Sequence, residues 1–166
     1  IGDGVPHQLP LKADDSCNEI IMAGVFCFKV SQQPDRERRM ILLNKFVLIA
    51  LGGACGALAR FGLAGAVQKT LGSGFPWGTA AVNIIGCGLF GIFWALAAER
   101  GHLSAEFRAF ILVGFLGSFT TFSTFISETS QLMTDSEMLA GLGNVAFQMI
   151  SGVGLFFLGL AAGRLL

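Results

Sequence analysis

The sequence predicts an all-α membrane protein with four transmembrane helices, and three observations support this fold class. The 166 residues are 53% hydrophobic and only 13% charged, and the mean hydropathy is +0.68. Glycine occurs 23 times and phenylalanine 16 times while tyrosine is absent, which is typical of helices that pack closely in lipid. Basic and acidic residues both number 11, so no net charge indicates a nucleic-acid partner.

Residues 1–39 differ sharply in composition from the rest of the chain. They contain 11 charged side chains, as many as residues 40–166 together. Their one apolar run, Ile20–Phe28, is much shorter than the ~20 residues that span a bilayer. We expect a disordered or non-native leader over residues 1–39 and a native start at Met40, which directly precedes a hydrophobic helix. A genuine cytosolic extension is the alternative.

Uncharged stretches within residues 40–166 predict a single domain of four membrane helices. The stretches are Phe46–Ala59, which continues past one arginine to Val67, Thr70–Ala98, Ala109–Ser127 and Met138–Gly163. Each can cross a hydrocarbon core of ~30 Å. Short polar hinges join them, so little of this region is left for an extramembrane domain.

The positive charges favour neither orientation of the four helices strongly. One side of the membrane is expected to receive Lys45, Arg100, Arg108 and Arg164. The other side receives Lys69 and, at the far end of the first helix, Arg60. Such a chain is expected to insert in both orientations. For Arg60 itself, snorkelling to the interface and attracting an anion at a pore vestibule are compatible roles.

Small residues recur four apart in every predicted helix. The pairs are Gly52 and Gly56, Cys87 and Gly91, Gly114 and Ser118, and Gly159 and Gly163. Such rows let the backbones of neighbouring helices approach closely in lipid. We therefore interpret most of these glycines as packing positions.

Asn83 is the sole amide in the second stretch. A single asparagine in a membrane helix usually forms hydrogen bonds with other helices. Its NH₂ group can also donate to an anion, which a carboxylate could not do. Both interpretations remain open on the residues alone.

The third stretch contains five hydroxyl side chains and two glycines between Gly114 and Phe125. Hydroxyls compete for backbone hydrogen bonds and glycine relaxes the helix, so we predict a break near its middle, at Gly117–Thr121. Carbonyls freed there must be buried or bound, and a cation is a suitable partner. Phe122 and Phe125 share a face, and their ring edges could approach an anion, although such spacing more often reflects packing.

The fourth stretch places Asn144 and Gln148 four residues apart, with Ser151 following. They form a possible polar track. They could equally bond to neighbouring helices, and spacing does not separate these alternatives.

Other classes of protein fit the sequence less well. A membrane enzyme lacks a nucleophile with a base, because both histidines lie outside the stretches. The four cysteines have no metal-ligand spacing. A small proton-coupled multidrug transporter also has four helices, but it needs a carboxylate within the membrane, and Glu128 at the edge of the third stretch is the single candidate. A purely structural assembly protein would not explain the hydroxyl-rich break.

Three blocks of residues resemble the Fluc fluoride channels, also called CrcB proteins. The blocks are Gly52-Gly53-Ala54-Cys55-Gly56-Ala57-Leu58-Ala59-Arg60, then Pro76-Trp77-Gly78-Thr79 with Asn83 and Gly86, then Thr120-Thr121-Phe122-Ser123-Thr124-Phe125 with Glu128. The resemblance covers residues 40–166. Ser118 departs from it, since the family often has a second glycine there, and the leader has no counterpart.

The resemblance implies a fluoride channel that exports fluoride from the bacterial cytoplasm across the inner membrane. It implies a dual-topology homodimer with antiparallel subunits, two fluoride pores at the interface and a structural sodium ion at the dimer centre. Carried over by position, Gly117 and Thr120 supply backbone carbonyls to sodium. The implied pore residues are Asn83 as a polar contact, Phe122 and Phe125 as the aromatic box, and Ser123 and Thr124 as hydroxyls.

Overall fold

A computed structural model describes residues 35–99, 103–134 and 138–166 of the protein. The chain divides into two compact units, residues 1–42 and 43–166. Helix α1 (Asp35–Leu71) begins in the first unit and continues in the second. The expected leader lies outside the described residues except for positions 35–39, so the start at Met40 stays a prediction.

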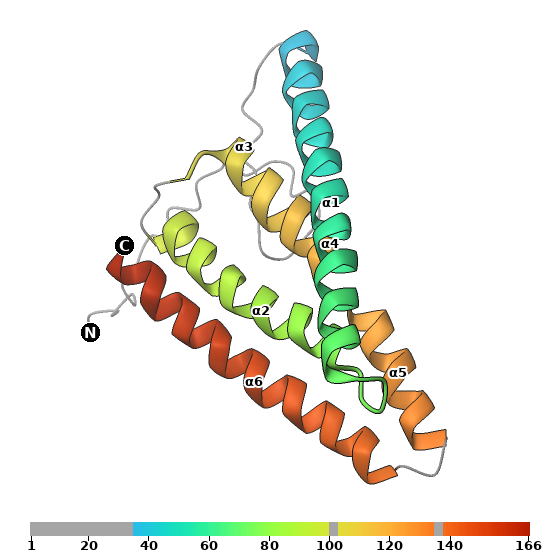
Figure 1. Ribbon diagram of the computed structural model, residues 1–166. Coiled ribbons are helices and arrows are strands. Elements are labelled where there is room, and N and C mark those ends of the chain that lie inside the picture. The colour runs from blue at the N-terminus through green and yellow to red at the C-terminus, as the bar shows by residue number, and fades with distance from the viewer. Residues whose placement is uncertain (1–34, 100–102, 135–137) are drawn as a thin grey trace, which may run out of the picture. The chain divides into compact units, whose positions relative to one another are not determined.

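The second unit is built from helices throughout its described part (Figure 1). After α1 follow α2 (Trp77–Trp94), η1 (Ala95–Glu99), α3 (Ala105–Arg108), η2 (Ala109–Leu116), α4 (Gly117–Phe119), α5 (Phe122–Thr134) and α6 (Met138–Leu165), of which η1 and η2 are π-helical. Four spans are long and apolar enough to cross a membrane: Arg39–Leu71, Trp77–Ala97, Ala105–Thr134 and Met138–Leu165. The prediction of an all-α protein with four membrane-capable helices is therefore confirmed.

The third span is longer at both ends than the uncharged stretch that predicted it. Ser104 caps its start, because its hydroxyl oxygen accepts a hydrogen bond from the Phe107 N–H at 3.1 Å. At its other end, the hydroxyls of Thr129 and Thr134 donate to the carbonyls of Phe125 and Ser130, one turn earlier. Polar residues thus extend the third span beyond the uncharged stretch Ala109–Ser127 that hydropathy detects.

The turn between α1 and α2 is organised by Gln68. Its amide nitrogen donates to the carbonyls of Gly72 and Phe75, and its oxygen accepts from the Gly78 N–H at 2.9 Å. Gly72 has a φ of +91°, a left-handed conformation that a residue with a Cβ rarely adopts. Pro76 then precedes the first residue of α2.

Glycines bring the helices of the second unit into backbone contact. A Cβ added at Gly114 in η2 would lie 2.7 Å from the Ile49 carbonyl oxygen of α1, and one added at Gly163 in α6 would lie 2.6 Å from the Ile92 carbonyl oxygen of α2. Added carbons at Gly91 and Gly159 would also collide with carbonyls of the opposite helix. The packing role predicted for these glycines is confirmed, and Figure 1 shows α2 and α6 side by side.

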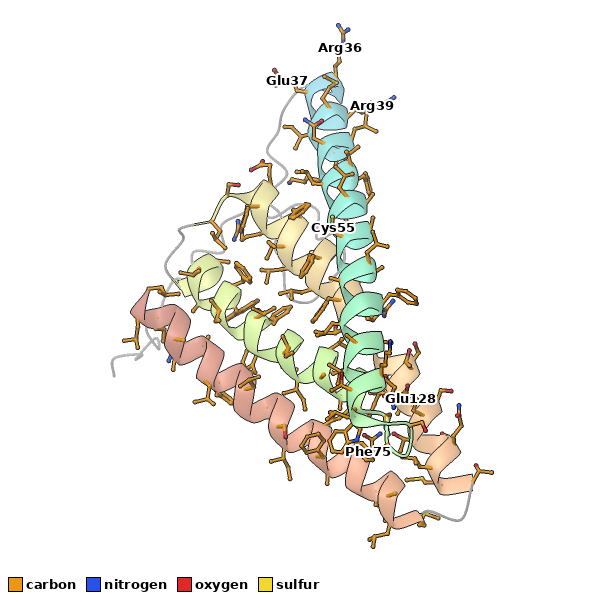
Figure 2. All side chains as sticks on the ribbon, viewed as in Figure 1. Arg36, Glu37, Arg39, Cys55, Phe75 and Glu128 are labelled. Carbon is orange, nitrogen blue, oxygen red and sulfur yellow. The ribbon has the colours of Figure 1, made fainter. Side chains whose placement is uncertain are left out.

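Apolar side chains also project from the outer faces of the helices (Figure 2). Large exposed side chains occur on α1, such as Leu58 and Phe61, and on α6, such as Ile150 and Leu158. The buried core lies between α2, η2, α5 and α6 and includes Val82, Leu112 and Leu116. A protein that is apolar inside and outside is suited to lipid, so the chain is a multi-pass membrane protein.

Candidate functional site

Two residues lie outside helices in the middle of the third span. Helix α4 ends at Phe119, and Thr120 has an extended backbone with φ −82° and ψ 159°. Thr121 then caps α5, since its hydroxyl oxygen accepts from the Thr124 N–H at 3.4 Å. The Thr120 hydroxyl donates to the Leu116 carbonyl at 3.0 Å. The Thr120 N–H still donates to the Leu116 carbonyl at 3.1 Å, whereas the Thr120 carbonyl and both backbone groups of Thr121 bond to residues of other helices.

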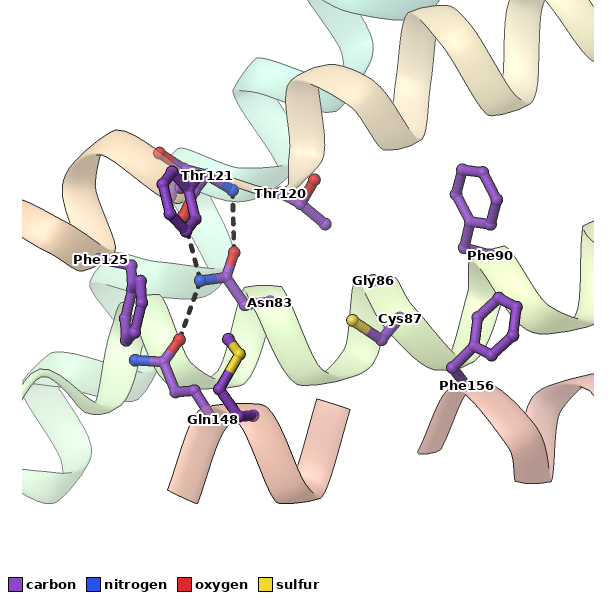
Figure 3. A pocket seen from close by; sticks show the side chains of 11 residues that line it. Asn83, Gly86, Cys87, Phe90, Thr120, Thr121, Phe125, Gln148 and Phe156 are labelled. Carbon is purple, nitrogen blue, oxygen red and sulfur yellow. Dashed lines mark hydrogen bonds between the residues drawn. The ribbon is translucent and has the colours of Figure 1, made fainter. Parts of the chain in front are cut away.

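Asn83 of α2 holds the Thr120–Thr121 segment from the side (Figure 3). Its Oδ1 accepts from the Thr121 N–H at 2.8 Å, and its Nδ2 donates to the Thr121 carbonyl at 3.1 Å. In a continuous α-helix that N–H would donate to the Gly117 carbonyl instead. The Asn83 side chain therefore takes the place of the Gly117 carbonyl as the acceptor for the Thr121 N–H.

A line of buried amides continues from Asn83 into α6. The Asn83 Nδ2 also donates to the Gln148 Oε1 at 2.9 Å, and the Gln148 Nε2 donates to the Asn144 Oδ1 at 2.8 Å. The Asn144 Nδ2 donates to the Thr129 hydroxyl of α5 at 2.8 Å. Asn144 is completely buried, so this line supplies the partners that such a polar group needs.

A pocket of about 280 Å³ lies beside Asn83 and the Thr120–Thr121 segment. Its lining consists of Asn83, Gly86, Cys87 and Phe90 of α2, Thr120 and Thr121, Phe122 and Phe125 of α5, and Gln148, Met149 and Phe156 of α6. The polar side chains in this lining are uncharged amides and hydroxyls. The other lining residues are one glycine, one cysteine, one methionine and four phenylalanines (Figure 3).

The two phenylalanines of α5 differ in their surroundings. Their ring centroids are 5.9 Å apart and the rings are tilted by 48°. Phe125 is 3% exposed, whereas Phe122 is 72% exposed at the edge of the same pocket. Phe125 is thus part of the protein core, whereas most of Phe122 is exposed on the surface of the chain.

The structure brings five of the sequence-predicted site residues to the pocket. They are Asn83, Thr120, Phe122, Phe125 and Gln148.

The other predicted site residues do not line this pocket. Gly117 and Ser123 belong to α4 and α5, and Ser151 lies in α6. The Thr124 hydroxyl accepts from that of Thr121 at 2.9 Å. The guanidinium of Arg60 lies close by, with Nη1 donating to the Thr120 carbonyl at 3.4 Å.

Charged and metal-binding groups are scarce at the site. Glu128 lies on α5 (Figure 2), and its Oε2 is a buried oxygen without a hydrogen-bond partner among the described residues. The described part of the chain has no cluster of histidine, cysteine, aspartate and glutamate that could hold a metal ion.

Sequence reasoning gave no site role to Thr121 or Thr129, nor to the pocket-lining residues Gly86, Cys87, Phe90, Met149 and Phe156. Thr121 caps α5 and is bonded to Asn83, and a threonine directly before a helix is a sequence signal for an N-cap. Asn144 accepts a hydrogen bond from Gln148 and donates one to the Thr129 hydroxyl, on the side of Gln148 away from Asn83. The sequence left two roles open for Asn144, a polar track or bonds to neighbouring helices, and no sequence signal pairs it with Thr129.

Comparisons with known proteins identify similar chains. The family model described as "CrcB-like protein, Camphor Resistance (CrcB)" matches residues 47–160. A protein of Solidesulfovibrio magneticus is 54% identical over 75% of this chain and 100% of its own length, and one of Desulforapulum autotrophicum is 49% identical over 74% and 98%. A protein of Thermus thermophilus is 44% identical over 73% and 96%. All three are named fluoride-specific ion channels.

Proposed function

The chain belongs to the CrcB family, and from this premise we propose that it is a fluoride-selective channel that lowers cytoplasmic fluoride by passive export. The relatives are named as ion channels, not as enzymes. The observation that carries the proposal is the pocket at the Thr120–Thr121 segment, where uncharged donors and two phenylalanine rings meet.

The chemistry of the pocket suits a small, strongly hydrated anion. Such an ion must exchange water for other donors, yet a fixed strong cation would hold it too tightly for conduction. Amides and hydroxyls donate without a net charge. The edges of Phe122 and Phe125 carry the positive side of the aromatic quadrupole and can approach the anion edge-on. In the proposal, Asn83 and Gln148 contribute the amides, Ser123 and Thr124 contribute hydroxyls, and Ser151 extends the polar track.

We assign the pores to the interface of an antiparallel homodimer. Phe122 lines the pocket but is mostly exposed, so a second copy could complete the wall that one protomer leaves open. A twofold arrangement of identical subunits repeats every such pocket and would yield two pores. Arg60 would attract the anion toward the pore, and its guanidinium donates to the Thr120 carbonyl in the middle of the third span.

A structural sodium ion at the dimer centre is compatible with the backbone at the Thr120–Thr121 segment. The Gly117 carbonyl loses its helical donor because the Thr121 N–H bonds to Asn83, and the extended Thr120 turns its own carbonyl out of the helix. Gly117 and Thr120 would hold the ion through these oxygens. When bound, sodium would add positive potential near an anion path without lining it.

The membrane proposed for this channel is the bacterial inner membrane, with the lipid bilayer as its surroundings.

A proton-coupled multidrug transporter remains the second candidate because of one observation. Glu128 carries a buried carboxylate oxygen without a partner among the described residues, as a proton-coupling site would require.

Liposome efflux tests the proposal directly. The purified full chain is reconstituted into vesicles loaded with fluoride or with chloride, and release is followed with ion-selective electrodes. We expect fast fluoride release that needs no proton gradient, and little chloride release. Transport that depends on a proton gradient, or equal release of both halides, would contradict a fluoride channel.

A further inference from the structure

The line of hydrogen bonds behind the pocket has backbone groups at both ends. It runs from the Thr121 backbone through Asn83, Gln148 and Asn144 to the Thr129 hydroxyl, and all its links between side chains are 2.8 to 2.9 Å long. The Thr129 hydroxyl then donates to the Phe125 carbonyl at 2.7 Å. The line therefore connects α2, α6 and α5 and both begins and ends at pocket-lining residues.

The direction of these hydrogen bonds is determined by the end at Phe125. A hydroxyl oxygen approaches a carbonyl oxygen to 2.7 Å only with the hydroxyl hydrogen between them, so Thr129 can accept but not donate to Asn144. Asn144 must then present its NH₂ to Thr129 and its oxygen to Gln148.

Gln148 follows the order set by Asn144. It must present its NH₂ to Asn144 and its oxygen to Asn83. The opposite end agrees, because the N–H and carbonyl of Thr121 admit one orientation of Asn83.

The direction of these hydrogen bonds determines which N–H or O–H group in the pocket has no acceptor. Both hydrogens of the Asn83 amide are used, one by the Thr121 carbonyl and one by Gln148. The hydroxyls of Thr120 and Thr121 are likewise committed to Leu116 and Thr124. Gln148 uses one of its two Nε2 hydrogens, for Asn144. Among the amides and hydroxyls of the pocket lining, Gln148 thus retains a hydrogen for a ligand.

We propose that Thr129 and Asn144 are positioning residues that orient Gln148, whose remaining amide hydrogen donates to the anion in the pocket. This inference rests on the proposed channel function. Neither Thr129 nor Asn144 lines the pocket, and they act by holding the amide of Gln148 in one orientation. The same bonds tie α5 to α6 beside Phe125, so they also hold the ring of Phe125 in place.

Substitution of Thr129 tests the positioning role. Thr129→Val keeps the shape but removes the hydroxyl, which leaves the buried Asn144 amide without its acceptor. Fluoride efflux from liposomes should fall on the order of tenfold. Thr129→Ser keeps the hydroxyl and should stay within about threefold of the wild type. A matched control is Thr134→Val, which removes the same kind of hydroxyl-to-carbonyl bond from the same helix, at an exposed site.

The wild-type channel supplies a readout that does not depend on any variant. Side-chain amide signals of Gln148 and Asn83 are followed by nitrogen-15 NMR while sodium fluoride is added, with sodium chloride as the control. We expect the Gln148 signals to shift when fluoride is added and to stay unchanged when chloride is added. A shift confined to Asn83, or wild-type efflux by Thr129→Val, would overturn the inference. Absence of fluoride efflux by the wild type would instead refute the proposed channel function.

Discussion

At the scale of single residues, one asparagine organises the centre of the protein. Asn83 makes three hydrogen bonds, two to the backbone of Thr121 and one to Gln148. Two interpretations of this residue were open in the sequence, a bond between helices and a donor to an anion. It bonds to Thr121 and to Gln148 on other helices, and its donation to an anion stays a proposal.

Phe122 and Phe125 are expected to respond differently to replacement by isoleucine. Both substitutions should lower fluoride efflux, because an aliphatic side chain has no ring edge to offer an anion. Phe125→Ile should also lower the free energy of unfolding by roughly 1–3 kcal/mol, since that ring is buried. Phe122→Ile should change it by less than about 0.5 kcal/mol in a protomer. Efflux and thermal unfolding in detergent measure the two effects, and unchanged efflux in both variants would remove the pair from the mechanism.

At the scale of elements, close contact between helices depends on particular glycines of α6. Gly159 lies against the Gly88 backbone of α2, whereas a Cβ at Gly154 in the same helix would meet no atom within 4 Å. The predicted small-residue row therefore has a structural function at Gly159 that the neighbouring Gly154 does not share.

Alanine substitution at these two positions provides a matched pair. Gly159→Ala forces α2 and α6 apart and should lower the free energy of unfolding by roughly 1–3 kcal/mol. Gly154→Ala should leave it unchanged or raise it by up to about 1 kcal/mol, because alanine favours the helix. Thermal unfolding in detergent compares them. Equal effects of the two substitutions would show that this contact contributes little.

At the scale of the whole molecule, exposed apolar faces and a pocket with an exposed edge both indicate that the protomer has neighbours in the membrane. Lipid can cover the apolar side chains of α1 and α6. In the proposed homodimer, a second copy covers the exposed Phe122 beside the polar pocket. Two predictions follow from the proposed dimer.

Sodium removal is expected to destabilise the assembled protein. An ion that binds only the folded dimer raises its stability according to its concentration and affinity. Replacing sodium by a large organic cation at equal ionic strength should therefore lower the melting temperature by about 2–8 °C. A melting temperature that is the same in both salts would argue against a sodium site at the Gly117 and Thr120 carbonyls.

Dual topology is tested by labelling from one side of the membrane. A cysteine is introduced at Ser73, in the turn between α1 and α2, after the native cysteines have been replaced. A membrane-impermeant maleimide added outside intact cells should label about half of the molecules, because the basic residues favour neither orientation. Labelling of all molecules, or of none before lysis, would show a single orientation.

The hydropathy of the sequence was sufficient to predict four membrane-capable helices, because the transfer of a helix into lipid depends on the sum of its own side chains. The blocks around Arg60, Asn83 and Phe122 were sufficient to indicate the family. The turn chemistry of Thr121 and the polar extension of the third span are local signals too, although hydropathy alone does not register them.

The partners of each polar side chain were decided by the tertiary structure alone. Asn144 and Gln148 could have faced a pore or another helix, and they bond to each other, while Asn144 reaches Thr129 and Gln148 reaches Asn83. Such choices depend on how each helix is rotated about its axis and how closely its neighbours approach. Periodicity places residues on one face of a helix, but the opposite helix determines which atoms that face will meet.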